Sequence, residues 1–576
     1  MKDLFKNLKF AWQYVKGDRK YLLIIIFVNI MDIILNVITP ILSAKIIIEL
    51  TTNNFKRMIS IAIMIFIVNF LSSMVHLVGR TFSTKMYRNA LSKIEIDLGS
   101  NILKLDNKCL DNNNSGVFIQ RLTSDTTKMA DVFNSMLGMV SIILKDIGVF
   151  IAIFIVNKII FFYIIGTMFI LYYLEKIRTD IRNKDDKEFR TQKEKVSGFI
   201  GELVRGARDI KMLNSEKDFI KELDNRIITT NDKMRLMHAN SIKFSTINWI
   251  ISDLLALIQI VLLVILIEKG YIISSIALVL YNYSKSVEHS IYTVGYFLEY
   301  IKDFNLSCER ITDILDDNKF SKEKFGNIHL DRVNGNFEFK NVSFSYDNNK
   351  VLKNLSFKIN ANETVAFVGK SGVGKTTIFN LLCKMYDINK GTITIDGVDI
   401  KELDKDSIRG NITIISQNPY IFNMSIKDNL RLVKSDLTEK EMITACKVAC
   451  LDEFIKTLPN KYDTIIGEGG VNLSGGQKQR LAIARALVQK TEIILFDEAT
   501  SALDNETQTK IKEAIENMKG EYTILMIAHR LSTIKNADRI LYLEDGNIKA
   551  EGTHKELLKS CIGYKKLYES ETIEKE

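Results

Sequence analysis

A glycine-rich turn at residues 369–376 has the residue types best suited to bind a phosphate chain. It reads Gly-Lys-Ser-Gly-Val-Gly-Lys-Thr, follows the apolar run 365–368 and precedes a helical run at 377–385. Glycines let successive backbone N–H groups turn inward around phosphate oxygens, and the following helix adds its positive end. We expect Lys375 to reach the β- and γ-phosphates and Thr376 to ligate Mg²⁺. The strand–turn–helix context distinguishes this pattern from a chance match.

A second apolar run, residues 493–496, ends in the two carboxylates Asp497 and Glu498. We expect a buried strand here that brings Asp497 to the Mg²⁺ shell. Phosphoryl transfer needs groups that position the reactants and stabilise charge rather than covalent catalysis. A solvated acidic pair at a strand end is the alternative, and the turn at 369–376 in the same chain argues against it.

The elements that would position these groups belong to a chain with two unlike halves. Residues up to about 300 are dense in Ile, Leu, Val and Phe, whereas the remainder has the composition of an α/β domain. A length of 576 residues favours several domains, and the presence of only three prolines permits long uninterrupted helices in the first half. A helix of about 20 apolar residues crosses a bilayer core. Six apolar stretches reach or approach that length: residues 21–40, 58–78, 132–156, 159–174, 247–267 and 271–296.

The formal net charge of +9 does not indicate a nucleic-acid partner, because of where the basic residues lie. In the first half they gather in the two long links, residues 79–131 and 175–246, and few occupy the short links. Such an excess marks the cytoplasmic side of a membrane protein, so both termini and the α/β half are expected in the cytoplasm. Residues 1–20 fit an amphipathic helix on the membrane surface. The abundance of Ile, Lys and Asn is typical of an AT-rich prokaryotic genome, which favours the plasma membrane.

The long links keep helical patterning, so the membrane helices are expected to continue into the cytoplasm. Each descending pair would turn at a tip, near residues 108–116 and 213–220, where the first is rich in Asn and contains Gly. The predicted domains are therefore a membrane domain at 21–312, a charged linker at 313–336 and an α/β domain at 337–570.

The sequence Leu-Ser-Gly-Gly-Gln at 473–477 lies between the phosphate-binding turn and the strand that ends in Asp497. In this order the three motifs resemble the nucleotide-binding domain of ATP-binding cassette (ABC) proteins, and the two tips resemble the intracellular loops of ABC exporters. The resemblance implies a multi-domain half-transporter: an all-α bundle of six transmembrane helices with long cytoplasmic extensions, followed by an α/β P-loop NTPase domain. In that family the tips are coupling helices that dock on the ATPase domain.

The resemblance also implies a role for single residues. Glu498 would polarise the attacking water, His529 would contact the γ-phosphate, and Gln417 would sense Mg²⁺; with Lys375 they form the expected catalytic set. The expected ATP contacts are Tyr346, Gly369, Ser371, Gly372, Gly374, Lys375, Thr376, Thr377 and Gln417. Tyr346 would stack on adenine, an ordinary strand tyrosine being the alternative. The expected Mg²⁺ ligands are Thr376, Gln417 and Asp497.

A further set of residues would act on a nucleotide held by a partner. The resemblance assigns this role to Leu473, Ser474, Gly475, Gly476, Gln477 and Asp504. Ser474 and Gly476 would cap the γ-phosphate bound to the partner's P-loop. Since one chain supplies one P-loop and one such segment, a dimer is expected. A homodimer is favoured, and a heterodimer with a second half-transporter stays open.

Polar residues recur at helical spacing inside the apolar stretches. They are Asn29, Asp32, Asn36, Asn69, His76, Asn248, Ser252, Gln259, Asn282, Lys285 and His289. Polar groups in a membrane face protein or water, so these residues predict either a hydrated substrate cavity or hydrogen bonds between helices. Both interpretations stay open.

These observations predict ATP-driven export of a hydrophobic or amphipathic substrate by alternating access, with ATP and Mg²⁺ as cofactors. Small molecules, lipids and peptides all remain as substrates, and membrane lipid surrounds the protein. The alternative is a membrane-embedded ABC ATPase that acts as a sensor or regulator without transport. A soluble-type cassette ATPase for DNA repair or translation disagrees with six spans and long cytoplasmic loops.

Overall fold

The computed structural model describes residues 2–573 apart from 52–53, 114, 318, 417–418, 468–469, 490, 498–504 and 528–533. The chain divides into two compact units. The first comprises Met1–Lys104 and Asn113–Phe320, and the second Leu105–Asn112 and Ser321–Glu576. A short internal segment of the N-terminal half therefore belongs to the same unit as the C-terminal half.

The first unit is built from helices across its described residues. These are α1 (Lys2–Val15), η1 (Lys16–Asp18), α2 (Arg19–Thr51), α3 (Phe55–Ile102), α5 (Ser115–Gln120), the π-helical turn η2 (Arg121–Asp125), α6 (Thr126–Val156), α7 (Lys158–Arg205), α8 (Ala207–Met212), α9 (Glu216–Glu268) and α10 (Ser274–Leu315). In a bilayer every backbone polar group must be satisfied inside the segment, which favours such long helices. Asn157 caps α7 by accepting a hydrogen bond from the Ile160 amide at 3.1 Å.

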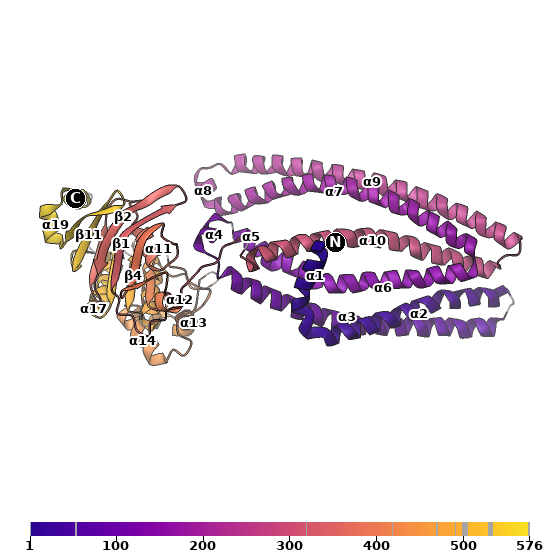
Figure 1. Cartoon of the computed structure of the whole chain (residues 1–576), viewed down its shortest axis with the longest axis horizontal. Helices are drawn as coiled ribbons and strands as arrows, with labels where there is room; N and C mark the ends of the chain where they lie inside the picture. Colours follow the sequence, from indigo (N-terminus) through magenta and orange to yellow (C-terminus); the bar gives the residue numbers. More distant parts are fainter. Residues whose placement is uncertain are drawn as a thin grey trace. The chain divides into compact units, whose positions relative to one another are not determined.

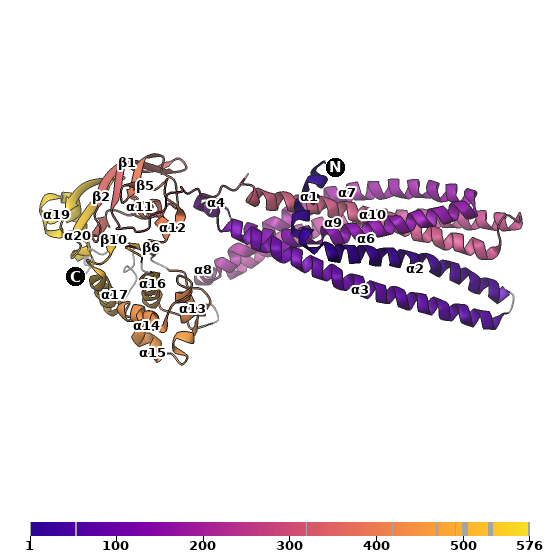
Figure 2. The same ribbon diagram turned by 60° about the horizontal axis from the view of Figure 1, so that its bottom comes forward.

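The long helices pack in neighbouring pairs. Figures 1 and 2 show α2 along α3 and α7 along α9, and α6 also contacts α10. Side chains from α6, α7, α9 and α10 form a shared apolar core. Its buried members include Val149, Ile153, Ile160, Ile164, Leu263, Leu266, Leu280 and Val287.

Five helical segments in the described part of the chain are long and apolar enough to cross a membrane. They are Asp3–Leu50, Phe55–Ile102, Ser115–Val156, Lys158–Arg205 and Glu216–Glu268. The sixth predicted span, residues 271–296, overlaps the first half of α10, which is long but more polar there than the five apolar segments. Its packing against α6 and α7 places α10 inside the same bundle.

The second unit contains a mostly parallel sheet of six strands in the order β12-β11-β3-β10-β9-β6. Its strands are β3 (Thr364–Val368), β6 (Ile412–Ile415), β9 (Ile493–Asp497), β10 (Thr523–Ile527), β11 (Arg539–Glu544) and β12 (Asn547–Gly552). Every residue of β3 and β10 is buried, as expected for inner strands covered on both faces. An antiparallel sheet in the order β2-β1-β4-β5 lies beside it, with β1 (Phe337–Tyr346), β2 (Asn349–Ile359), β4 (Lys390–Ile395) and β5 (Val398–Asp399). The pair β7 (Met424–Ser425) and β8 (Ile465–Ile466) completes the strands.

Two apolar cores cover the two faces of the six-stranded sheet, and alternate residues of β3 enter each: Ala366 and Val368 one, Val365 and Phe367 the other. The helices around them are α11 (Lys375–Leu382), α12 (Lys405–Arg409), α13 (Ile426–Arg431), α14 (Glu439–Val448), α15 (Asp452–Thr457), η3 (Lys461–Asp463), α16 (Gly475–Gln489), α17 (Asn505–Met518), α19 (His554–Ser560) and α20 (Ile562–Ile573). Figure 2 shows α13, α14 and α15 grouped beside α16.

The predicted linker and the first predicted tip both contribute to the second unit. Helix α10 ends at Leu315, and the chain joins the second unit at Ser321. The segment Leu105–Asn112 includes α4 (Asn107–Asn112), in the region predicted as a coupling tip. Helix α8, near the second predicted tip, belongs to the first unit.

Candidate nucleotide-binding site

The phosphate-binding turn lies between β3 and α11, at the centre of the parallel sheet. Gly372 and Gly374 have φ angles of +79° and +107°, a region that favours glycine. A Cβ on Gly374 would lie 2.7 Å from Leu352 Cδ2, and one on Gly369 would lie 2.4 Å from the Leu543 carbonyl oxygen. Glycine is therefore required here for both conformation and space, and the backbone stays open to a phosphate chain.

Lys375 begins α11 and is only 5% exposed. Its Nζ donates to the carbonyl oxygens of Gly369 at 2.8 Å and Lys370 at 3.1 Å. The ammonium group is thus held at the turn itself, where the charge of a bound phosphate chain would lie. Ser371 is exposed on the turn, and Thr377 is buried in the first turn of α11.

Thr376 and Asp497 meet although they are far apart in the sequence. The Thr376 hydroxyl donates to Asp497 Oδ1 at 3.3 Å. Parallel strands β3 and β9, both paired with β10, bring the two residues to the same edge of the sheet. A hydroxyl and a carboxylate are hard oxygen donors of the kind that Mg²⁺ prefers, so these two residues fit the ion.

Four predicted residues lie outside the described residues: Gln417, Glu498, Asp504 and His529. Their places in the sequence still relate to the sheet. Gln417, Glu498 and His529 follow the strands β6, β9 and β10, which are neighbours and run parallel. Their catalytic roles stay predictions.

Tyr346 is the last residue of β1 and is partly exposed. Its ring makes edge-to-face contacts with Phe344 at 4.7 Å and Tyr386 at 5.1 Å between centroids. A cavity of about 470 Å³ opens beside these three aromatic rings. An aromatic ring fixed at the edge of a cavity is suited to stacking on a planar base.

Helix α4 provides part of the wall of the same cavity. Lys108 Nζ lies 2.8 Å from Asp347 Oδ1, and the Tyr386 hydroxyl donates to Asp111. Burial, and after it the carboxylate of Asp111, raises the pKa of Tyr386, which keeps this hydroxyl protonated as a donor. The sequence did not identify Asp347 or Tyr386 as contacts of this helix, because their types are ordinary for a loop and a strand neighbour.

The segment 473–477 forms the start of α16. Ser474 Oγ accepts from the Gln477 amide at 3.3 Å, while Gln477 Oε1 accepts from the Ser474 amide at 2.8 Å. This reciprocal cap fixes the helix start, with Leu473 and Gly476 buried and Gly475 exposed. The positive end of a helix of 15 residues is suited to a phosphate group.

Several polar residues of the predicted membrane spans contact one another. Asp32 Oδ1 accepts from Ser72 Oγ at 2.8 Å, and its Oδ2 lies 3.3 Å from His76 Nε2. Gln259 Nε2 donates to Ser284 Oγ at 2.5 Å, and Gln259 is buried. These contacts match hydrogen bonding between helices.

Other polar residues of the spans are placed differently. Ser252 donates to Glu288 Oε2 at 3.2 Å, and Lys285 Nζ lies 3.4 Å from the same oxygen. Sequence reasoning missed Glu288, whose position three residues after Lys285 in an apolar stretch was the available signal. Asn248 is buried, Asn29 is partly exposed, and Asn69 and Asn282 are exposed. The side chains of Asn36 and His289 lie outside the described residues.

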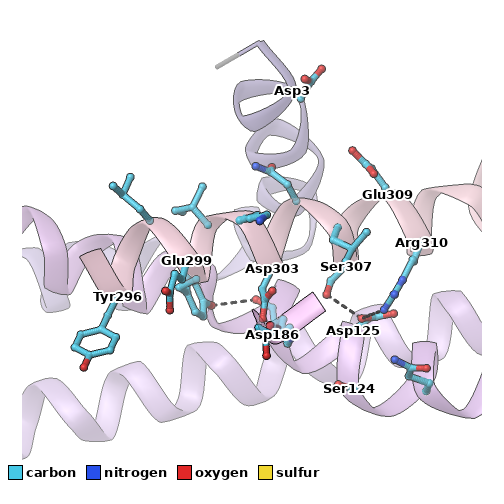
Figure 3. Close-up of a pocket in the computed structure, with 18 of the residues that line it drawn as sticks. Asp3, Ser124, Asp125, Asp186, Tyr296, Glu299, Asp303, Ser307, Glu309 and Arg310 are labelled. Atoms are coloured by element: carbon cyan, nitrogen blue, oxygen red, sulfur yellow. Dashed lines mark hydrogen bonds and ion pairs between the residues drawn. The ribbon is translucent and has the colours of Figure 1, made fainter. Parts of the chain in front are cut away.

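A cleft of about 1510 Å³ opens in the first unit among α6, α7 and α10. Figure 3 shows Asp125, Ser307 and Arg310 together on one side of it. Asp125 is 2% exposed, accepts from Ser307 Oγ at 2.8 Å and lies 3.7 Å from Arg310 Nη1. Both signs of charge line the cleft, including the pair Lys128–Asp303 at 3.0 Å. The lining combines charged and apolar side chains and does not select one sign of charge.

Comparisons with known proteins cover both units. The family model for the ABC transporter transmembrane region matches residues 22–286, and that for the ABC transporter matches residues 352–501. An ATP-dependent lipid A-core flippase of Haemophilus influenzae is 33% identical over 472 residues, 80% of this chain and 78% of that protein. The same-named protein of another strain is 45% identical over 266 residues, an alignment that spans about half of either chain, 46% and 45%.

A longer alignment extends over nearly the whole chain. An uncharacterized ABC transporter ATP-binding protein of Bacillus subtilis is 27% identical over 588 residues, 99% of this chain and 95% of that protein. A solved structure of a bacterial Atm1-family ABC exporter with ATP bound has a TM-score of 0.83. It is 23% identical and covers 96% of this chain and 98% of its own, which establishes a shared fold. The chain therefore belongs to the ABC transporter family of ATP-hydrolysing transporters, with its transmembrane region and nucleotide-binding domain fused in one polypeptide.

Proposed function

We propose that this chain binds and hydrolyses ATP with Mg²⁺ and uses the energy to export a hydrophobic or amphipathic substrate. The observation that carries the proposal is the contact of Thr376 with Asp497 at 3.3 Å beside the buried Lys375. A phosphate cradle and two oxygen ligands for the metal thus come together in a chain that also carries a helical membrane half.

In the proposed reaction Lys375 binds the β- and γ-phosphate oxygens, and Thr376 and Asp497 hold Mg²⁺. Bound Mg²⁺ supplies charge stabilisation to the phosphate oxygens. Glu498 polarises the water that attacks the γ-phosphorus, His529 contacts the γ-phosphate, and Gln417 joins the metal shell. These residues position groups and stabilise charge, which is the main requirement of phosphoryl transfer.

The working unit in this proposal is a dimer. Ser474 caps α16 and fixes its helix start, whose positive end is suited to an anion. In an ABC dimer this end would face the nucleotide on the partner's P-loop, together with Gly476 and Asp504. The intact motif set favours two copies of this chain, and a heterodimer would require a second half-transporter.

Transport would proceed by alternating access across the plasma membrane, with both termini and the ATPase domain in the cytoplasm. The cleft beside Asp125, which is lined by charged side chains of both signs, supports a path for polar groups within the helical unit. Relatives named lipid A-core flippases support a lipid or another amphipathic molecule as the substrate class. Polar residues at the helix contacts, such as Ser252 with Glu288, are candidates for its polar part.

The test is to purify the chain in lipid nanodiscs and measure Mg²⁺-dependent ATP hydrolysis beside Glu498→Gln. The exposed Glu521→Gln serves as the matched control. Hydrolysis lost only in Glu498→Gln would support the assigned base and a self-sufficient homodimer. No hydrolysis by folded wild-type protein would overturn the homodimer.

The transport half of the proposal needs a second measurement. The chain is reconstituted in liposomes that contain a fluorescent phospholipid, and ATP-dependent movement between leaflets is followed by a membrane-impermeant quencher. Movement that requires ATP and Glu498 would support lipid transport. Vigorous hydrolysis without movement of lipids, peptides or amphipathic drugs would contradict export and favour a regulator.

A further inference from the structure

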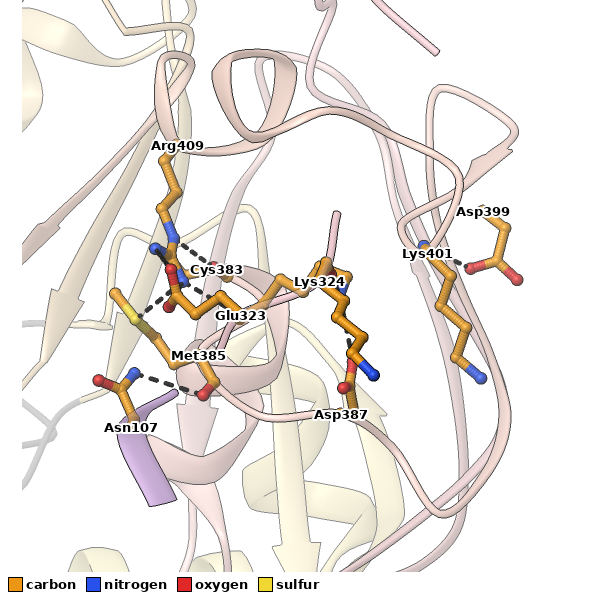
Figure 4. A network of polar contacts seen from close by, with 10 residues as sticks. Asn107, Glu323, Lys324, Cys383, Met385, Asp387, Asp399, Lys401 and Arg409 are labelled. Carbon is orange, nitrogen blue, oxygen red and sulfur yellow. Dashed lines mark hydrogen bonds and ion pairs between the residues drawn. The ribbon is translucent and has the colours of Figure 1, made fainter. Parts of the chain in front are cut away.

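An arginine in the second unit holds together segments that are remote in sequence. Arg409, the last residue of α12, donates through both terminal nitrogens to Glu323, with Nη1–Oε2 and Nη2–Oε1 distances of 2.9 and 2.7 Å. Figure 4 shows the guanidinium facing the Glu323 carboxylate. A two-bond arginine–carboxylate pair is stronger and more directional than a single surface ion pair. Both side chains are mostly buried, with 20% and 12% of their surfaces exposed.

The same guanidinium also binds the C-terminal end of the P-loop helix. Its Nε donates to the Cys383 carbonyl at 3.1 Å, and its Nη2 to the Lys384 carbonyl at 3.0 Å. Cys383 is the cap of α11, which begins with Lys375. A cation at this end satisfies carbonyls that no longer have partners in the helix. Arg409 therefore joins the P-loop helix to the linker residue Glu323.

The linker is held here at further points. Phe325 lies under two cations, with Arg409 Cζ and Lys384 Nζ each 5.1 Å from its ring centre. Lys384 is buried and also donates to the Lys324 carbonyl. Gly326 packs so closely on Glu402 that a Cβ would lie 2.0 Å from its carbonyl oxygen. Residues 323–326 are thus held by several contacts within the second unit, and we call them the fastened segment.

Helix α4 is attached to the start of this fastened segment. Leu105 and Lys322 form an antiparallel β-bridge, and the Asp106 amide donates to the Ser321 carbonyl at 3.0 Å. Asn107 Nδ2 donates to the Met385 carbonyl at 3.3 Å, which continues the contact to the end of α11. The chain crosses between its two units at 104/105, 112/113 and 320/321. The first and third of these crossings are therefore tied directly to each other.

We infer that Arg409 and Glu323 are positioning residues. They attach the linker, and through it α4, to the P-loop helix α11, so that the linker and α4 move with this helix as one coupling joint. A displacement of α11 on nucleotide binding would move both connections to the helical unit together. Arg409 also precedes β6, the strand that leads to Gln417, so the joint borders a second nucleotide-responsive segment. The attachment of the linker and α4 to α11 is seen as contacts within one unit. Its role in transmitting nucleotide binding to the helical unit rests on the proposed function.

The first test uses hydrogen exchange of the full-length chain in nanodiscs without nucleotide. Glu323→Ala removes the linker end of the pair and leaves the Arg409 contacts to α11 in place. Glu402→Ala, an exposed carboxylate of the adjoining segment, is the matched control. We expect Glu323→Ala to speed amide exchange in 105–112 and 321–328 by about tenfold, as for loss of a charged hydrogen bond. Glu323→Asp, which keeps the charge, should restore much of the protection. Equal exchange in Glu323→Ala and Glu402→Ala would overturn the fastening.

The second test measures transmission in the same samples. Mg-ATP with vanadate should change exchange in α10 and α6 of the wild-type and Glu402→Ala proteins. In Glu323→Ala that change should fall at least twofold, with all proteins compared at saturating Mg-ATP so that a change in ATP affinity does not contribute. An undiminished nucleotide response with loosened 105–112 would overturn the coupling role. Wild-type protein that neither hydrolyses ATP nor responds to it would sink the proposed function, and the nucleotide-free comparison would still decide the fastening.

Discussion

The hydroxyl of Thr376 lies 3.3 Å from Asp497 Oδ1, although 121 residues separate the two in the sequence. The contact arises because β3 and β9 run parallel on either side of β10 and end at the same edge. Thr376 is the last residue of the phosphate-binding turn, and Asp497 is the last residue of strand β9. The pair places together the two oxygen ligands of the proposed Mg²⁺ site.

Removing the Thr376 hydroxyl should therefore separate metal-dependent hydrolysis from nucleotide binding. Thr376→Val keeps the side-chain shape but loses the oxygen, and we expect Mg²⁺-dependent ATP hydrolysis to fall by about 100-fold, or 2.7 kcal/mol in barrier height. Thr376→Ser keeps the oxygen and should retain most activity. Metal-free binding of a fluorescent ATP analogue should change little in either variant. Full hydrolysis by Thr376→Val would contradict the assigned metal ligand.

Replacing Gly374 by alanine should cost more stability and more ATP binding than the same change at another glycine with a positive φ. Gly374→Ala imposes a φ of +107° on alanine and places its Cβ 2.7 Å from Leu352 Cδ2. Gly397 has a φ of +88°, but a Cβ there meets no atom within 4 Å. We expect Gly397→Ala to cost about 1 kcal/mol of stability, and Gly374→Ala to cost more and to abolish ATP binding. Thermal unfolding and ATP-analogue binding measure the two effects, and equal behaviour of the variants would refute the spatial argument.

The sequence predicts a site residue well when the residue acts within a single turn or strand end, and poorly when it acts through a partner remote in the sequence. Gly374, Lys375 and Thr376 were predictable because one turn carries both their conformation and their chemistry. The Thr376–Asp497 contact was also predictable, since buried parallel strands end at a common edge. The Arg409–Glu323 pair was not, because the chain has 78 Lys and Arg and 69 Asp and Glu residues and no local signal matches one to another. The sixth span, predicted over 271–296, overlaps the long helix α10, whose polar residues serve contacts such as Lys285 with Glu288.

Tyr346 should determine affinity for the base of the nucleotide. Its ring makes edge-to-face contacts with Phe344 and Tyr386 and lines the cavity of about 470 Å³ in which a base would stack. Loss of base stacking on an aromatic ring costs about 1–3 kcal/mol, so Tyr346→Ala should raise the dissociation constant for ATP at least several-fold. Tyr346→Phe keeps the ring and should bind ATP nearly as well as wild type. Calorimetric titration distinguishes the two, and unchanged affinity of Tyr346→Ala would mean that the tyrosine is an ordinary strand residue.

His329 and Asp404 should make the linker contact sensitive to pH. His329 Nδ1 lies 2.8 Å from Asp404 Oδ2. Hydrogen bonding to Asp404 raises the pKa of His329, and bonds from Ser407 and His329 lower the pKa of Asp404 to about 2. The histidine contribution is present below its unfolded pKa and is lost as pH rises through the raised folded pKa. The Asp404 contribution is present above its ordinary pKa and is lost as pH falls towards about 2.

The window in which both groups contribute therefore lies between the ordinary pKa values of aspartate and histidine. His329→Gln should lower the unfolding temperature of the chain at pH 6 but leave it near the wild-type value at pH 8.5. The side chains of His329 and Asp404 are 58% and 30% exposed, so screening by solvent keeps the effect small. His238→Gln, an exposed site in α9, controls for loss of an imidazole. A difference that grows with rising pH would contradict the assignment.

Glu175 and Arg178 form a buried ion pair along α7. Replacing only one partner should destabilise the helical unit more than replacing both. Glu175 is 4% exposed and Arg178 8%, and the arginine Nε donates to Glu175 Oε2 at 2.9 Å. Gly295 of α10 is close enough that a Cβ there would lie 3.0 Å from Glu175 Oε1. Water therefore has little room to replace the arginine. Arg178→Met should destabilise the helical unit by about 3–5 kcal/mol, because it leaves a buried carboxylate uncompensated.

Adding Glu175→Gln to Arg178→Met should recover much of that loss, since the buried charge then disappears with its partner. Lys233→Met removes one partner of the exposed Lys233–Glu188 pair and should leave the unfolding midpoint near that of wild type. Thermal unfolding in nanodiscs, followed by tryptophan fluorescence, compares the four proteins. A double variant no more stable than Arg178→Met would show that packing of the arginine stem, rather than the unpaired charge, dominates at this site.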